Sequence, residues 1–276
     1  MSVQIIIDST VDLKPELLKE VKVAPLSILF GSEQFIDGKT LTKQEFYQKL
    51  VTSDVLPTTS QATPFIFSEL YKETIDEGNE AIVITISSKL SGTFQSANIA
   101  SMDYEGKVYV VDSLNAAIGA GVLAEYALRL SKVGLSAKQI YNILEEDKHN
   151  LCLIALLDTL EYLHKGGRIP KTVAMAGGLL SIKPLITLNE GSISLLGQAR
   201  GTKKGNALLD KKVHEMGEIN FEKPVIFGYT GNEDDLLKKY IESSDCNWHD
   251  YTITDLSGVI GTHVGPGAFA VAYFKK

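Results

Sequence analysis

Residues 81–94 read AIVITISSKLSGTF, an apolar run rich in β-branched residues that leads into hydroxyl side chains, a glycine and a helical pattern. The run at residues 81–86 is too short for a typical helix and too continuously apolar for a half-exposed strand. It therefore predicts a central strand of a parallel sheet. The following helix is expected to begin near Thr93. Its core face is expected to carry Phe94, Ala97, Ile99 and Ala100.

Hydroxyl side chains follow this predicted strand at its carboxyl end. In an open α/β sheet, ligands bind beyond the carboxyl ends of the strands, where the next helix also offers unpaired backbone N–H groups. The hydroxyls here belong to Ser87, Ser88, Ser91 and Thr93. This arrangement predicts an anion-binding site between the strand and the helix.

Length and composition indicate a globular protein with one large or two medium domains. The chain has 276 residues, of which 44% are hydrophobic and 22% are charged. Its net charge of -7 and its pI near 5.3 argue against general nucleic-acid binding, which requires a basic face. Small molecules or other proteins are therefore the expected partners.

The cysteines and the amino-terminal residues predict a cytoplasmic protein. Cys152 lies in an apolar run and Cys246 lies beside polar residues, without metal-ligand spacing or a disulfide-rich context. Residues 1–8 lack the basic start and long apolar core of a signal peptide. No stretch of the sequence is apolar for long enough to predict a membrane span.

The first half of the chain alternates strand and helix signals. Strands are expected over residues 3–7 and 107–111, and a hairpin over residues 26–36 with its turn at residues 31–32. Helices are expected after the caps at Thr42 and Thr63. A short helix near Pro15 and longer helices over residues 115–130 and 136–148 complete the pattern. The pattern predicts a Rossmann-like parallel sheet with flanking helices.

The second half combines a hairpin with helices and further strands. Residues 182–188 and 192–195 form the expected hairpin, and residues 151–157 indicate a strand or a buried helix. Further strands are expected over residues 224–229, 248–254 and 269–274, with helices over 203–216 and 233–241. This half is expected to form a mixed or antiparallel sheet with helices. The predicted architecture is two α/β domains, at residues 1–155 and 156–276.

A second hydroxyl cluster lies in residues 57–64, which read PTTSQATP before a predicted helix. One interpretation is a capped turn, because Ser and Thr satisfy open N–H groups at helix ends. The alternative is a hydrogen-bonding cradle for a ligand. The similar cluster at residues 87–93 favours the cradle.

His263 is the most suggestive histidine. It lies in residues 261–268, GTHVGPGA, where three glycines and a proline predict a loop of unusual backbone conformation. An imidazole there could donate a hydrogen bond to a carboxylate, or it could cap a carbonyl within a turn. The remaining histidines lack metal-binding spacing and are expected to be structural or exposed. They are His149, His164, His214 and His249.

Two basic segments stand out in an acidic chain. Residues 158–169 resemble a helix end, where capping accounts for the glycines and neighbouring basic residues but not for Arg168. Residues 198–204 offer Arg200 together with Lys203 and Lys204. These cations either form a docking patch for an acidic partner or start a solvated helix.

Small apolar residues are concentrated at residues 116–123 and 174–180. Tight helix packing accounts for most stretches of this kind. Such stretches could equally wall a narrow apolar tunnel. Burial of an acyl chain in a tunnel would contribute about 0.8 kcal/mol per methylene, while a few hydroxyls would orient its head group.

Short motifs in collinear order over almost the whole chain resemble those of the DegV family. They are DST at residues 8–10, TSQ at 59–61, ITISSKLSGT at 84–93, VDS at 111–113, GGRI at 166–169, KP at 183–184 and HVGPGA at 263–268. Characterised members are the fatty-acid-binding subunits of bacterial fatty acid kinase. The resemblance implies two α/β domains with one long-chain fatty acid buried between them.

Carried over by position, the resemblance assigns the carboxylate ligands to Thr59, Ser91 and His263. Three neighbours, Ser60, Gly92 and Thr93, would complete the cradle. The family's docking positions for the kinase fall on Arg168 and, less directly, Arg200.

The implied role is that of a binding protein and not an enzyme. It would present the carboxylate to a separate ATP-dependent fatty acid kinase subunit, then carry the acyl phosphate to an acyltransferase of phospholipid synthesis. The bound fatty acid would be its only ligand, with no cofactor or metal. Transient contact with a membrane surface would accompany lipid transfer.

An enzyme is the alternative from another functional class. Ser91 and His263 could serve a serine hydrolase, or a phosphotransferase acting on a small substrate. The chain lacks a Gly-x-Ser-x-Gly elbow around Ser91 and a Gly-x-x-x-x-Gly-Lys-Ser/Thr phosphate loop. No orienting acid for a catalytic triad is assigned. A regulatory module that keeps lipid only as a stabiliser is the third hypothesis.

Overall fold

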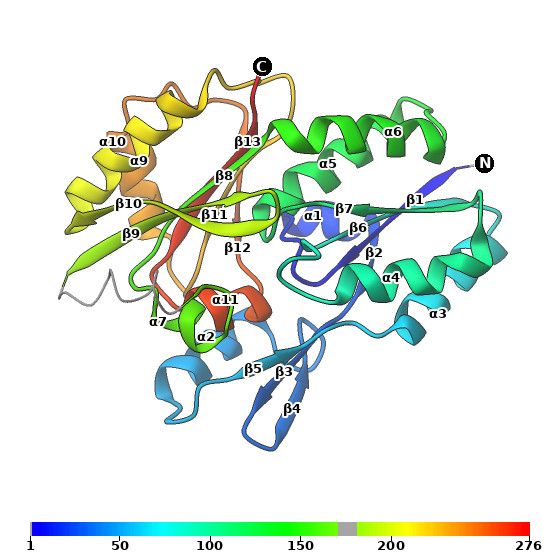
Figure 1. Ribbon diagram of the computed structural model, residues 1–276, viewed down its shortest axis with the longest axis horizontal. Coiled ribbons are helices and arrows are strands. Elements are labelled where there is room, and N and C mark those ends of the chain that lie inside the picture. Colours follow the sequence, from blue (N-terminus) through cyan, green and yellow to red (C-terminus); the bar gives the residue numbers. More distant parts are fainter. Residues whose placement is uncertain (1, 171–180) are drawn as a thin grey trace.

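The computed structural model describes residues 2–170 and 181–276. Two large sheets lie in separate halves of the molecule, with helices between them and on their outer faces (Figure 1). A small sheet lies beside the line where the two halves meet (Figure 1). This arrangement confirms the predicted α/β class.

The first large sheet is parallel, as predicted. Its strand order is β2-β1-β6-β7, and each neighbouring pair runs in parallel. The strands are β1 (Val3–Asp8), β2 (Val21–Ala24), β6 (Glu80–Thr85) and β7 (Val108–Asp112). β6 is central, and its residues 81–85 are buried because helices cover both faces. The order in which the strands are added reverses between β1 and β6, and open α/β sheets bind ligands at such a point.

Helices cover both faces of this sheet. α3 (Pro64–Asp76) and α4 (Thr93–Ser101) pack on one face, and α5 (Ile118–Lys132) and α6 (Ala137–Asp147) pack on the other. A short helix, α1 (Pro15–Leu18), joins β1 to β2, and 3₁₀ turns at Met102–Tyr104 and Lys148–Asn150 follow α4 and α6. Thr63 caps α3 through its hydroxyl, as predicted, and Ser136 caps α6 in the same way.

Two details of these helices differ from expectation. Ala97 and Ala100 of α4 are buried as predicted, but Ile99 is 46% exposed. The prediction for Ile99 was wrong because only one narrow face of this nine-residue helix is buried, and Ile99 lies outside that face. α5 begins at Ile118 and not at Asn115, since Leu114 and Ala117 adopt positive φ angles of 51°.

The second large sheet is mixed, as predicted, with strand order β10-β9-β8-β13-β11-β12. β11 and β12 pair in parallel, and the other neighbouring pairs are antiparallel. The strands are β8 (Leu151–Leu156), β9 (Ile182–Asn189), β10 (Ser192–Arg200), β11 (Val225–Tyr229), β12 (Tyr251–Asp255) and β13 (Phe269–Phe274). α9 (Thr202–Met216) and α10 (Asp235–Ser243) cover its outer face (Figure 1).

A third, small sheet has the order β4-β3-β5. β3 (Ser27–Phe30) and β4 (Glu33–Ile36) form the predicted hairpin, which is followed by α2 (Lys43–Thr52) with its capping box at Thr42. β5 (Thr58–Ser60) was expected to be a turn. It is a strand because its backbone pairs with β3, a partner that is distant in the sequence and leaves no local signal.

One apolar core joins the two large sheets. α5 lies between them and packs against β1 and β6 on one side and against β8, β11 and β13 on the other (Figure 1). The core residues around α5 accordingly come from both halves of the chain. β8, which contains residue 155, belongs wholly to the second sheet. Within the two described segments of the chain, no helix combines the length and the apolar character needed to cross a membrane.

The approach of α5 to the loop after β1 predicts a large cost for a small substitution. A methyl group at Gly121 would overlap the backbone carbonyl oxygen of Asp12, which cannot rotate away. We expect Gly121→Ala to lower the free energy of unfolding by about 1 to 3 kcal/mol despite the higher helix propensity of alanine. Urea unfolding followed by circular dichroism measures the change.

Gly205→Ala is the matched control. A methyl group there would lie 2.9 Å from a terminal carbon of Leu156, a flexible side chain that can move. We expect a change within about 1 kcal/mol. Equal losses in the two variants would contradict the role assigned to the Asp12 carbonyl.

Candidate functional site

A cavity of about 300 Å³ lies between the two halves of the protein. Its walls are mainly apolar and come from both large sheets and from the short helix α11 (Gly258–Val264). Alternate residues of one strand and its continuation, Leu153, Ala155 and Leu157, all face it. The cavity therefore exists only where the two halves pack together.

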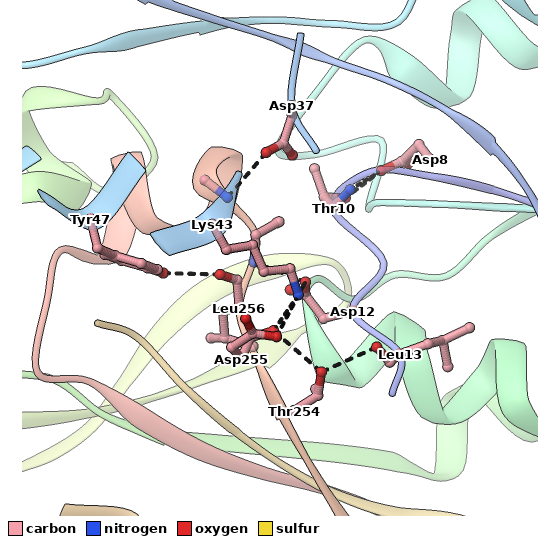
Figure 2. Close-up of polar contacts among 12 residues, drawn as sticks. Asp8, Thr10, Asp12, Leu13, Asp37, Lys43, Tyr47, Thr254, Asp255 and Leu256 are labelled. Atoms are coloured by element: carbon pink, nitrogen blue, oxygen red, sulfur yellow. Dashed lines mark hydrogen bonds and ion pairs between the residues drawn. The ribbon is translucent and has the colours of Figure 1, made fainter. Parts of the chain in front are cut away.

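The segments that follow the carboxyl ends of β1 and β6 form one wall of the cavity. The carboxylate of Asp8, at the end of β1, accepts hydrogen bonds from the backbone N–H of Thr10 at 2.8 Å and of Ile86 at 2.7 Å. Figure 2 shows the contact between Asp8 and Thr10. Asp8 is fully buried, and burial raises its pKa although these hydrogen bonds oppose the shift. Thr10 and Ile86 themselves line the cavity.

Polar side chains gather at one end of the cavity. Thr59, Ser91, His263 and Arg168 all line it. Thr59 Oγ1 lies 2.9 Å from His263 Nε2, and the guanidinium of Arg168 donates to the carbonyl oxygen of Leu90, the residue before Ser91. The sequence placed these side chains in four separate segments, and the fold brings them together.

Thr59 is held in place by contacts on both sides. β5 pairs with β3, with Thr59 opposite Ile28. Gln61 lies against Gly92, where any side chain would overlap its amide, and its Nε2 donates to Ser96 Oγ at 2.9 Å. The absence of a side chain at Gly92 therefore lets the segment after β5 rest on the start of α4.

Ser91 precedes α4 and is oriented by Thr93. Ser91 Oγ lies 2.9 Å from Thr93 Oγ1 and accepts a hydrogen bond from the backbone N–H of Thr93 at 3.3 Å. Thr93 is buried behind Ser91 and does not line the cavity. Ser60 and Gly92 do line it, and Ser60 is exposed to solvent. The nearby amino end of α4 adds a positive partial charge that favours an anion.

His263 lies on a helix, so the prediction of a loop was wrong for residues 261–264, whereas Gly265 and Gly267 adopt the positive φ angles of an unusual backbone. α11 spans Gly258–Val264, and the glycine and proline that follow mark its end, with Gly265 at φ 74°. Glycines were taken as a loop signal, but those within α11 allow close packing against α2. Gly166 similarly permits close approach of the His263 ring, since a side chain there would overlap Nδ1.

The imidazole of His263 is neutral at physiological pH. Burial and then the positive charge of Arg168 lower its pKa to about 4. A neutral imidazole carries one N–H, so the tautomer decides whether Nε2 donates to Thr59 Oγ1 or Thr59 donates to Nε2. Nδ1 is buried and has no hydrogen-bond partner among the described residues. This nitrogen lies against Gly166, where an added side chain would overlap it.

Arg168 is part of the cavity wall. Its side chain is half-buried, and its guanidinium donates to the carbonyl oxygens of Leu90 and Gly166. Burial lowers its pKa without removing its charge at neutral pH. Arg200 lies exposed at the end of β10 and does not line the cavity. Docking of a protein partner by these two arginines remains a prediction.

The hydrogen bonding of this site differs from that of a serine hydrolase. In the described part of the chain, the hydroxyl of Ser91 bonds with Thr93 and not with an imidazole. The ring of His263 bonds with Thr59, and its other nitrogen has no carboxylate partner among residues 2–170 and 181–276. A catalytic triad requires both contacts. The arrangement suits the binding of an anionic head group by neutral donors and one cation.

The apolar walls were only partly visible in the sequence. Of residues 116–123, Ala116 and Ala117 line the cavity, and the others belong to the core around α5. Residues 174–180 lie outside the described residues. The sequence analysis did not identify Leu153, Ala155 and Leu157 as cavity residues. Alternate residues of a strand face the same side, so recognition of a strand there could have indicated them.

A second polar cluster lies behind the cavity wall (Figure 2). Lys43 Nζ lies 3.5 Å from Asp12 Oδ1 and 2.9 Å from Asp255 Oδ1. Asp37, also buried, accepts a hydrogen bond from the backbone N–H of Gly258 at 3.2 Å. Burial raises the pKa of Asp12 to about 7 and that of Asp37 to about 6, although Lys43 opposes both shifts. No motif in the sequence analysis indicated this cluster.

Comparison with known proteins identifies relatives that match along their whole length. The family model described as "Uncharacterised protein, DegV family" matches residues 2–276. A DegV domain-containing protein of Deinococcus radiodurans is 34% identical over 275 residues, covering 99% of this chain and 98% of that protein.

Two solved structures share the fold. A DegV family protein from Thermus thermophilus, described as binding fatty acid, has a TM-score of 0.88 and 32% identity, covering 99% of this chain and 100% of that one. DegV from Bacillus subtilis, described as a fatty acid binding protein, has a TM-score of 0.83 and 28% identity, covering 100% of both chains.

The positive charge of Arg168 acts on His263 and predicts a measurable pKa difference. The imidazole of His263 should titrate near pH 4, because burial and the guanidinium both disfavour its charged form. Arg168→Met removes the charge while keeping an apolar stem, so it should raise the pKa of His263. Histidine side-chain NMR titration measures both values. Arg200→Met is the control and should leave the pKa unchanged, and an equal shift in both variants would contradict this electrostatic coupling.

Proposed function

The chain belongs to the DegV family, and we propose that it binds a long-chain fatty acid in the cavity between its two halves. One observation carries the proposal: an apolar cavity of about 300 Å³ has hydroxyls, an imidazole and a guanidinium gathered at one end. A fatty acid has the matching distribution of polarity. The fatty-acid-binding descriptions of the two structural relatives support the same ligand.

The two parts of such a ligand would be bound by different forces. Each buried methylene contributes about 0.8 kcal/mol, so the acyl chain supplies most of the affinity. A carboxylate buried without hydrogen bonds would be strongly unfavourable. Thr59, Ser91 and His263 supply donors at the polar end, and Arg168 supplies a positive charge. In the proposed complex, Ser60 and Gly92 complete the cradle, and Thr93 orients Ser91.

The proposal extends to a role in a kinase system. We propose that the protein presents the carboxylate to a separate ATP-dependent fatty acid kinase subunit and carries the acyl phosphate toward an acyltransferase of phospholipid synthesis. Exposure of Ser60 and Gln61 at the polar end supports access from outside. Arg168 could then contact the new phosphate from within the cavity, and Arg200 could contact the kinase from the surface.

The remaining features of the proposed role concern its setting. The chain acts in the cytoplasm without a cofactor, and its acyl ligand passes to and from membranes by transient contact. We propose domains at residues 1–155 and 156–276, a boundary that falls within β8 of the second large sheet.

The first prediction concerns the copurified lipid. Protein produced in bacteria should retain a long-chain fatty acid, because the apolar chain is bound inside the protein. Native mass spectrometry, followed by extraction and gas chromatography, would identify it. A protein that is isolated empty and also fails to bind added fatty acid would refute the proposal.

The second prediction concerns the head-group donors. Ser91→Ala and Thr59→Val should each weaken fatty-acid binding by about 1 to 3 kcal/mol, or about 5- to 150-fold, through loss of a charge-assisted hydrogen bond. Displacement of a fluorescent fatty acid measures the dissociation constants. Ser101→Ala, at the opposite end of α4, is the control and should bind as the unaltered protein does.

The third prediction tests the kinase role. Incubation with ATP and a bacterial fatty acid kinase subunit should convert the bound acid into an acyl phosphate, trapped as its hydroxamate. Arg168→Met should reduce the yield while leaving the fold intact. Normal fatty-acid binding without any conversion would favour the regulatory module over the kinase system.

A further inference from the structure

Helix α11 carries both the imidazole of the site and part of the cavity wall. Val259, Ile260, His263 and Val264 all line the cavity. α11 belongs to the second half of the chain, but its contacts are largely with the first half. The position of the His263 ring relative to Thr59 therefore depends on how α11 is held against residues of the first half.

Two glycines bring α11 into close contact with α2 and β3. A methyl group at Gly258 would lie 2.7 Å from a terminal carbon of Ile28, and one at Gly261 would lie 2.6 Å from the ring of Phe46 and 2.7 Å from Tyr47 Oη. These separations are shorter than ordinary van der Waals contact. α11 therefore packs without intervening side chains on one side.

Polar contacts with the first half fix the amino end of α11 (Figure 2). Asp37 Oδ1 accepts from the backbone N–H of Gly258 at 3.2 Å, and Asp12 Oδ1 accepts from that of Ser257 at 2.9 Å. These N–H groups have no partner within the helix, so the two carboxyl groups satisfy donors that would otherwise be buried without acceptors.

The chain entering α11 is held as well. Tyr47 donates to the carbonyl oxygen of Leu256 at 3.2 Å, and Lys43 donates to that of Asp255 at 2.6 Å (Figure 2). Leu256 also lines the cavity. The segment that leads into α11 is therefore bound to α2 immediately behind the cavity wall.

We infer that Asp12 and Asp37 are positioning residues of the cavity, which hold the amino end of α11 and thereby set the contact between His263 and Thr59. Ionisation of these two acids changes the way α11 is held and so changes the environment of the imidazole. The consequence for ligand affinity rests on the proposed function, whereas the consequence for His263 does not.

The charges around the two acids determine the pH range of this effect. Asp12 faces Lys43 of α2, Asp37 after β4 and Asp255 of β12, and Tyr47 of α2 faces the same group. Protonation of Asp12 and Asp37 is centred at about pH 7 and about pH 6 respectively, because burial disfavours their ionised forms. Oδ2 of each carboxyl has no partner among the described residues, which is compatible with a proton there.

The imidazole of His263 does not itself titrate in this range. Burial and the neighbouring Arg168 keep its pKa at about 4. A change in its NMR signals near pH 6 to 7 therefore reports on a group other than the ring. In the folded state, raised carboxyl pKa values stabilise the protein below the unfolded pKa and lose that contribution as the pH rises through 6 to 7. At the same time, ionisation strengthens the hydrogen bonds that Asp12 and Asp37 accept from the backbone N–H groups of Ser257 and Gly258, because these bonds favour the charged carboxyl groups.

The test follows the His263 ring in the full chain after lipid removal. Histidine side-chain NMR is recorded from pH 5 to 8.5, with the signal assigned by comparison with His263→Gln. The unaltered protein should show a step in the His263 shift between pH 6 and 7. Asp12→Asn and Asp37→Asn should each reduce it, because an amide oxygen still accepts the helix N–H but does not ionise.

Asp76→Asn is the matched control, since Asp76 is an exposed acid of α3 paired with Lys72. It should leave the step unchanged. Absence of the step in the unaltered protein, or its persistence in both Asp12→Asn and Asp37→Asn, would overturn the inference. Circular dichroism confirms that each variant is folded, and the two independent variants keep the test decisive if one of them is not.

Ligand affinity provides a separate readout. Between pH 5.5 and 8, the ratio of the fatty-acid affinity of the unaltered protein to that of Asp12→Asn should rise by about threefold to tenfold, because the ionised Asp12 accepts a stronger hydrogen bond. Displacement of a fluorescent fatty acid measures both affinities, and ionisation of the ligand cancels in their ratio. If no fatty acid binds at any pH, the proposed function fails, while the His263 step still decides the positioning role. If binding is tight but the step is absent, only the positioning role fails.

Discussion

The hydrogen bond between Thr59 and His263 joins residues 204 positions apart. Each of the two residues is held in position by packing of its own segment against other parts of the first half. Thr59 is held by pairing of β5 with β3, and His263 by the packing of α11 on α2 and β3. The small sheet and α2 thus form a common support for both side chains. Without this support the polar end of the cavity would not form.

The cavity places polar donors in apolar surroundings without accumulating charge. The imidazole of His263 is kept neutral by burial and by Arg168, and the hydroxyls of Ser91 and Thr59 are neutral at all physiological pH values. Arg168 is the charged member among these four lining residues, and backbone carbonyls satisfy its guanidinium. An anion entering this site would meet donors that are already oriented, so little reorganisation would accompany its binding.

Structure was predicted correctly from the sequence where interactions between residues close in the sequence determine the conformation. The caps at Thr42 and Thr63 form as expected because a hydroxyl and the N–H groups of the next turn lie within one helical turn. The hairpin of β9 and β10 also follows from its tight turn at residues 189–191. The failures at β5 and α11 concern segments of three and seven residues. Such short segments adopt their conformation through distant partners, and glycines within them can indicate either a turn or close packing.

The sequence by itself determined the α/β class, the parallel and mixed sheets, and the three polar segments around Thr59, Ser91 and His263, because periodicity and turn chemistry are local properties. Only the tertiary structure decided that these segments meet at one end of an apolar cavity and that Arg168 lies in its wall. It also revealed the buried acids Asp12 and Asp37 behind α11. The physical reason is that burial and hydrogen-bond pairing between distant segments arise only when the two halves of the chain pack together.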